Sequence, residues 1–174
     1  MADAIEQLKS FRKRREELEK EIKDTGKRLF KEAVETIFEE HPKLVAFCWT
    51  QYTPYFNDGD ACTFSAHTDD PYIQFGDEED LNEYHFRDSD RVCDGEEEVT
   101  DWRGRTVKQT KYKWVKRQVT EEESSKHAAH KALGEFLGLF CSDDYEAMFG
   151  DHVSVIVTKK DNGVKIETEG YSHD

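Results

Sequence analysis

The sequence lacks long hydrophobic runs: no stretch of about 18 apolar residues occurs anywhere in the chain. The first twenty residues are charged throughout and contain no apolar region like that of a secretory signal peptide. A membrane-spanning helix is therefore excluded, and the pattern favours a cytoplasmic protein that has no membrane partner.

Cysteine is scarce, and the motifs that mark common active sites are missing. The four cysteines, Cys48, Cys62, Cys93 and Cys141, are far apart and form no CxxC pair. Such spacing, without a secretory signal, is typical of reduced thiols and argues against structural zinc. The chain has no P-loop, GxGxxG or GxSxG motif. We therefore predict no cofactor, and a non-enzymatic function is favoured over an enzymatic one.

Basic residues are nearly missing from one segment. The chain has 39 acidic and 25 basic residues and a net charge of -14. Residues 57–101 contain sixteen acidic and two basic residues, so this segment carries the whole net charge and the remainder is balanced. Such a surface would repel nucleic acid and attract a basic protein or a cation. A solvated acidic loop explains the same pattern.

Residues 3–41 predict one long helix, which ends before Pro42. Its front half carries apolar residues at a spacing close to 3.5, the heptad pattern of a coiled coil. The apolar positions of this seam are Leu8, Phe11, Leu18, Ile22 and Leu29, with the polar residues Arg15 and Thr25 between them. A helix cannot bury such a seam alone. Self-association into a homo-oligomer is the simplest interpretation, and packing against the same chain is the alternative.

Behind the seam the apolar stripe widens, as expected where a helix packs on a domain core. Gly26 marks this change and would allow a bend. The basic cluster Arg12–Arg15 is interpreted as surface charges that pair with glutamates four positions later, rather than as a nucleic-acid site. We therefore assign residues 1–42 to a helical arm.

Residues 43–174 predict a globular domain. The run KLVAFCWTQYTPYFNDGDACTFSAH is typical of a β-hairpin, with a turn at residues 57–60. Both faces of its first strand are largely apolar, so we expect this strand to be central and covered on both sides. Residues 153–168 predict a second hairpin that turns at Asn162-Gly163.

Residues 57–101 are interpreted as an acidic insertion, with short strands or extended connections at Tyr72–Phe75 and Glu83–Arg87 between acidic turns. The next run, TVKQTKYKWVKRQV, predicts a long half-buried strand whose lysines pair with the acidic segment. Thr120 and Glu123 form a capping box at the start of a second helix, and residues 143–149 predict a short one. The expected fold is α+β: a long N-terminal helix, then an antiparallel sheet of five to six strands packed by a second helix.

Two candidate binding surfaces stand out. One is an aromatic stretch beside an acidic turn, and the other is a run of carboxylates. The first comprises Trp49, Tyr52, Tyr55, Asn57, Asp58 and Asp60, and the second comprises Asp77, Glu78, Glu79 and Asp80. Aromatic rings with a polar end suit recognition of a ligand or protein, but the same rings would also suit a core.

A calcium or magnesium site is a weaker candidate. Carboxylates at Asp90, Asp94, Glu96 and Asp101 fall near the spacing of an EF-hand loop. Val92 occupies a place where that loop needs an oxygen ligand, and the flanks do not predict a helix pair. A zinc site at His127 and His130, one helical turn apart, would need a third ligand from another element.

The run FCWTQYTPYFNDGDACTFS, together with the C-terminal EGYSHD, resembles a family of small phage and bacterial proteins that share such a hairpin and tail. The resemblance covers residues 46–65 and 153–174. It implies no activity or catalytic residue, only the context of a cytosolic accessory protein. It also implies that the turn and the tail lie together.

These observations favour a non-enzymatic interaction protein. It would self-associate through its N-terminal helix and present a negative surface to a basic protein partner, for example as a phage accessory protein or host-directed inhibitor. One alternative is a divalent-metal-dependent hydrolase of phosphoesters or nucleotides, with ligands from the acidic segment. Another is a small-molecule binder that uses the hairpin from Trp49 to Asp60.

Overall fold

The computed structural model describes residues 2–55, 59 and 61–172, except for the side chains of residues 2, 3 and 22. The chain forms two compact units, one from residues 1–84 and 125–174 and the other from residues 85–124. Helices and antiparallel sheets occur together, so the predicted α+β class is confirmed, with six strands in the described residues. These strands do not form one sheet: four lie in the first unit and two in the second.

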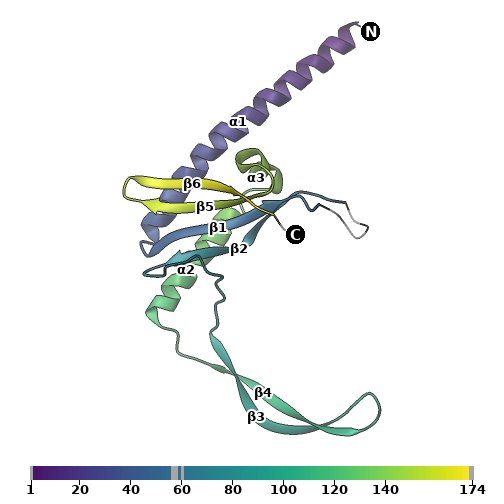
Figure 1. Ribbon diagram of the computed structural model, residues 1–174, viewed down its shortest axis with the longest axis vertical. Coiled ribbons are helices and arrows are strands. Elements are labelled where there is room, and N and C mark those ends of the chain that lie inside the picture. The colour runs from purple at the N-terminus through teal and green to yellow at the C-terminus, as the bar shows by residue number, and fades with distance from the viewer. Residues whose placement is uncertain (1, 56–58, 60, 173–174) are drawn as a thin grey trace. The chain divides into compact units, whose positions relative to one another are not determined.

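The first unit is built on a four-stranded antiparallel sheet with the order β2-β1-β5-β6 (Figure 1). Its strands are β1 (Leu44–Tyr52), β2 (Ser65–Phe75), β5 (Val153–Lys160) and β6 (Gly163–Gly170). The hairpin of β1 and β2 is confirmed, and β1 is central as predicted. The separate short strand expected at Tyr72–Phe75 is the end of β2. Pro71 is tolerated within β2 because β2 is an edge strand.

The second predicted hairpin is also confirmed. Lys160 pairs with Gly163, so the turn residues are Asp161 and Asn162, one position before the predicted pair. Gly163 follows the turn with φ 114°, a conformation that favours glycine. A Cβ atom at this position would also lie 2.9 Å from Glu35 Oε1, so the turn approaches the end of the long helix closely.

Three helices complete the first unit: α1 (Ala2–Glu40), α2 (Glu121–Leu137), whose first residues belong to the second unit, and α3 (Ser142–Phe149). Their apolar side chains meet one face of the sheet in a single core. Fully buried Phe30 of α1 lies 5.9 Å from the Trp49 ring and 5.0 Å from Phe136 of α2, measured between ring centroids. Rings of α3 also pack on Trp49, with Tyr145 at 5.6 Å and Phe149 at 5.5 Å.

The helices leave the opposite face of β1 only partly covered. Phe47, Trp49 and Gln51 are buried. On the other face Ala46 is buried, but Cys48, Thr50 and Tyr52 are only partly buried. The prediction that both faces of this strand are covered therefore holds only in part.

The long helix is continuous through Gly26. A Cβ atom at Gly26 would lie 3.2 Å from the Met148 sulfur, so this glycine allows α3 to pack closely on α1. A bend is therefore not needed to explain why glycine occupies position 26. In the described part of the chain, no helix combines the length and the apolar character needed to cross a membrane.

The second unit is a two-stranded antiparallel ribbon of β3 (Ser89–Thr100) and β4 (Thr106–Lys116) (Figure 1). The acidic turns expected around residues 93–101 are largely strand. At Glu83–Arg87, where a short strand or a connection was expected, the chain forms a connection without regular secondary structure. The predicted basic strand is confirmed as β4. It is exposed at every residue and pairs with β3 alone, so its expected half-burial within the main sheet is wrong.

The capping box at the start of α2 is confirmed. The Thr120 backbone N–H donates to Glu123 Oε2 at 2.9 Å, and the Glu123 N–H donates to Thr120 Oγ1 at 3.1 Å. Arg117 reinforces it, because its guanidinium nitrogens lie 3.2 and 2.8 Å from the two Glu123 carboxylate oxygens. The Arg117 bond, together with the Thr120 backbone bond, lowers the pKa of Glu123 to about 2.

Candidate functional site

The seam on α1 is exposed to solvent. The exposed fractions are 69% for Leu8, 72% for Phe11, 49% for Leu18 and 50% for Leu29. The side chain of Ile22, the fifth predicted seam residue, lies outside the described part of the structure. The face of α1 that packs in the core carries Phe30. At 3.6 residues per turn, the seam lies about a quarter of a turn around the helix from that face. The C-terminal part of the helix therefore has a covered apolar face, and the N-terminal part has a separate, exposed apolar seam.

The basic cluster beside this seam is engaged in helix-surface ion pairs, as predicted. Arg12 Nε lies 3.2 Å from Glu16 Oε1, and Arg15 Nε lies 2.6 Å from Glu19 Oε1. Both pairs are exposed to solvent, and Arg15 occupies one of the two polar positions within the seam.

Negative charge is distributed differently from the sequence interpretation. The ribbon unit, residues 85–124, contains ten acidic and nine basic residues and is nearly neutral. Its carboxylates pair across the strands as predicted: Lys113 Nζ lies 2.7 Å from Asp94 Oδ1, and Lys108 Nζ lies 3.4 Å from Glu96 Oε2. The excess negative charge of the acidic segment therefore lies before the ribbon.

The described residues that carry this excess negative charge belong to β2 and to the loop after it. Residues 65–84 contain seven carboxylates and no lysine or arginine. Six of these carboxylates belong to exposed residues and form what we call the acidic surface: Asp69, Asp70, Asp77, Glu79, Asp80 and Glu83. Glu78, predicted as a member, has a structural role instead. It forms an ion pair with Lys126 and accepts a hydrogen bond from the Phe75 N–H at 3.0 Å.

The aromatic candidate surface divides between the core and the sheet end. Trp49 is 1% exposed, so its assignment to a binding surface is wrong and it belongs to the core. Tyr52 stacks on His67 with ring centroids 4.7 Å apart, and Tyr171 of the C-terminal tail lies 5.4 Å from Tyr52. Asn57, Asp58 and Asp60 lie outside the described residues.

Tyr55, the remaining aromatic candidate, stacks on His152 at 4.6 Å. His152 has φ 54°. Asp151 organises this corner, because its Oδ1 accepts hydrogen bonds from the backbone N–H groups of Thr53 at 2.8 Å and His152 at 2.7 Å. Burial raises the pKa of Asp151, but hydrogen bonds from Thr53 and His152 outweigh it and hold the pKa below its usual value. These contacts tie the end of β1 to the start of β5.

The candidate metal ligands do not converge. Asp90, Asp94 and Glu96 lie on β3 rather than in a loop, and Asp101 follows that strand. Asp101 accepts backbone hydrogen bonds from Arg103 and Arg105 at 2.9 Å, and the Arg105 bond in particular lowers its pKa. Among the described residues, no group of three or more His, Cys, Asp or Glu side chains is placed to hold a metal ion.

The two histidines of α2 contact other side chains. His130 Nε2 lies 3.3 Å from Asp70 Oδ1, and Tyr84 lies 5.2 Å from the His130 ring and 6.3 Å from that of His127. Nor does Cys48 suit nucleophilic chemistry, because burial raises the pKa of its thiol and so disfavours the thiolate.

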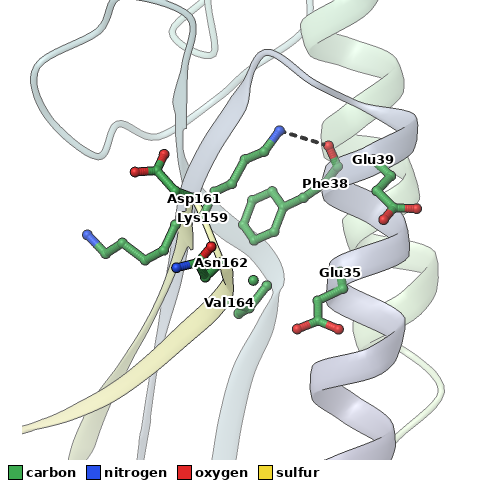
Figure 2. Close-up of a pocket in the computed structure, with 9 residues that line it drawn as sticks. Glu35, Phe38, Glu39, Lys159, Asp161, Asn162 and Val164 are labelled. Atoms are coloured by element: carbon green, nitrogen blue, oxygen red, sulfur yellow. Dashed lines mark hydrogen bonds between the residues drawn. The ribbon is translucent and has the colours of Figure 1, made fainter.

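A cavity of about 410 Å³ lies between the end of α1 and the turn of β5 and β6 (Figure 2). Figure 2 shows Lys159 reaching across to the helix, where Nζ donates to the Phe38 carbonyl at 3.1 Å. It also donates to the Pro42 carbonyl at 3.3 Å. Lys159 therefore satisfies carbonyl groups at the helix C-terminus, and its amine is engaged in holding α1 on the sheet.

No family model, curated protein or solved structure matches this chain.

Proposed function

We propose that this protein is a non-catalytic interaction protein, assembled from two copies through the seam on α1, that presents its acidic surface to a basic protein partner. The role of a phage accessory protein or host-directed inhibitor enters the proposal from the sequence resemblance alone. The exposure of the seam is the observation that carries the proposed assembly.

The seam supports pairing with a second copy because its residues keep heptad spacing while they stay outside the core. Monomeric proteins rarely leave such contiguous apolar side chains in water. Packing of the seam against the first unit is not supported, because four seam residues remain about half-exposed or more within that unit. Two such helices bury both seams by knobs-into-holes packing.

The acidic surface supports a basic partner. Its six exposed carboxylates lie within fifteen consecutive residues, 69–83, that contain no lysine or arginine. Clustered charge of one sign speeds encounter with the opposite sign and gives binding that weakens with salt.

The assembly claim is tested with the double variant Phe11→Glu/Leu18→Glu. Its control, Ser10→Glu/Lys13→Gln, makes the same change in charge at exposed positions away from the seam. By sedimentation equilibrium, we expect the seam variant to raise the dissociation constant of the dimer at least tenfold, because it places charges at two positions that the proposed dimer buries. The control should leave it within about twofold. An unchanged dissociation constant in the seam variant would contradict assembly through α1.

The surface claim is tested with Asp77→Asn/Glu79→Gln/Asp80→Asn and a deca-lysine peptide as the probe. The control, Glu96→Gln/Glu97→Gln/Glu98→Gln, removes the same charge from β3. We expect the first variant alone to weaken peptide binding and to flatten its salt dependence. Equal weakening by both variants would mean that only net charge matters.

A further inference from the structure

The ribbon of β3 and β4 exposes large side chains that a solvated hairpin does not need. Trp114 is 70% exposed and Tyr112 is 46% exposed. A two-stranded hairpin is only marginally stable in water, and exposed aromatic residues are typical of interaction surfaces. These side chains therefore make the ribbon a candidate interaction surface.

One face of the ribbon carries both rings. Side chains alternate along a strand, and the pairing register places Arg91 opposite Trp114 and Glu98 opposite Lys108. The Arg91 guanidinium lies 3.8 Å from the centre of the Tyr112 ring, which confirms that these residues share a face. We call this the aromatic face and define it by Arg91, Glu96, Glu98, Lys108, Tyr112 and Trp114.

Charge is segregated between the two strands. Among the charged side chains of β3 only Arg91 is basic, and β4 has four lysines and no carboxylate. On the aromatic face itself, β3 carries Glu96 and Glu98 toward one end and Arg91 toward the other, and β4 carries Lys108 opposite Glu98. The unit as a whole is nearly neutral, so neither a polyanion nor a strongly basic partner is favoured. A surface with one acidic and one basic strand is instead complementary to itself.

We propose that the aromatic face packs against the aromatic face of a second copy. A two-fold axis parallel to the strands, midway between two stacked ribbons, places β3 of each copy over β4 of the other at the same level. Glu98 of one copy then meets Lys108 of the other, and Arg91 meets the Trp114 ring in a cation–π contact. The arrangement is closed, because each copy uses the same residues. It is a second contact, argued independently of the seam on α1.

The test uses the full-length chain with the seam variant Phe11→Glu/Leu18→Glu as background, so that association through α1 is removed. Glu98→Lys and Lys108→Glu are added separately, and sedimentation equilibrium gives the dissociation constants. In the proposed dimer each single variant brings like charges together at both contacts between positions 98 and 108. We therefore expect each to weaken association at least tenfold.

An equimolar mixture of the two variants is the decisive arm. When a Glu98→Lys copy pairs with a Lys108→Glu copy, opposite charges meet again at both contacts between positions 98 and 108. Association in the mixture should therefore return to within about threefold of the background. Repulsion between these positions within one ribbon is present in both variants and cannot explain a recovery on mixing. As controls, Glu97→Lys and Lys111→Glu change the opposite face and should not weaken association.

Trp114→Thr gives an independent measurement, because threonine keeps the strand propensity and removes the ring. It should also weaken association at least tenfold. The inference is overturned if the seam variant is monomeric at every concentration, if the mixture associates no better than the single variants, or if the controls weaken it equally. An unchanged dissociation constant for the seam variant relative to the natural chain would contradict the α1 proposal, while the mixing experiment would still decide this one.

Discussion

Strands β1 and β4 both carry a tryptophan, yet one is buried and the other is not. Trp49 on β1 is 1% exposed, whereas Trp114 on β4 is 70% exposed. The difference comes from their neighbours. β1 lies between two strands and beneath three helices, while β4 pairs only with β3. A strand-like residue pattern thus predicts that a strand forms, and the elements packed on it decide how deeply its side chains are buried.

The largest expected effect separates the two tryptophans. Trp49→Ala removes a ring packed on Phe30, Tyr145 and Phe149, so we expect it to lower the free energy of unfolding of the first unit by about 3–5 kcal/mol. Trp114→Ala should change the same quantity by less than about 0.5 kcal/mol. Urea unfolding followed by near-ultraviolet circular dichroism measures both. Equal losses would contradict the contrast between the two strands.

A smaller difference in stability is expected between variants of a glutamine on β1 and a glutamine on β4. Gln51 is fully buried, accepts a hydrogen bond from Trp49 Nε1 at 3.0 Å and donates to the carbonyls of Tyr145, at 3.2 Å, and Gly150. Gln51→Leu removes all three hydrogen bonds from a buried site, and we expect a loss of about 2–3 kcal/mol in the free energy of unfolding.

The matched change on the ribbon, Gln109→Leu, affects an exposed side chain. It should leave the stability of the first unit within about 0.5 kcal/mol of the unchanged chain. A loss for Gln109→Leu comparable with that for Gln51→Leu would show that the ribbon contributes to the core.

The smallest expected effect concerns the capping box that follows the ribbon. Since the pKa of Glu123 falls from 4.5 to about 2 on folding, its stabilising contribution is complete above pH 4.5 and is lost as the pH falls toward 2. An NMR titration of the Glu123 carboxyl should give a midpoint near 2. In Arg117→Ala the midpoint should move back toward 4.5. A midpoint that is unchanged in Arg117→Ala would contradict the assignment of the pKa shift to Arg117.

Local signals predicted much of the fold. Both hairpins of the main sheet, the capping box, the short helix α3 and the strand β4 follow from residue patterns that act over a few positions. The cross-strand pairing of lysines with carboxylates does so too. The grouping of strands into sheets did not follow. It depends on which helix covers which face, and no local pattern in TVKQTKYKWVKRQV distinguishes a covered strand from an exposed one.

The candidate site shows the same limit. Trp49 was misplaced because both faces of β1 are apolar, and the polar residue two positions later, Gln51, is itself buried. His67 and Tyr171, which pack on Tyr52, were not predicted as site residues. Only the family resemblance linked the C-terminal tail, with Tyr171, to the first hairpin, because Tyr52 and Tyr171 are far apart in sequence. The seam on α1, in contrast, is defined by helix periodicity alone. Four of its five predicted residues are exposed on α1, and its role in assembly stays a prediction.

The most direct test of the central claim is the molar mass of the unchanged chain by sedimentation equilibrium over a range of concentrations. The monomer mass is 20.4 kDa. Assembly through exposed apolar surfaces predicts a mass that rises with concentration toward at least twice this value. A mass that stays at the monomer value at every concentration would contradict the account.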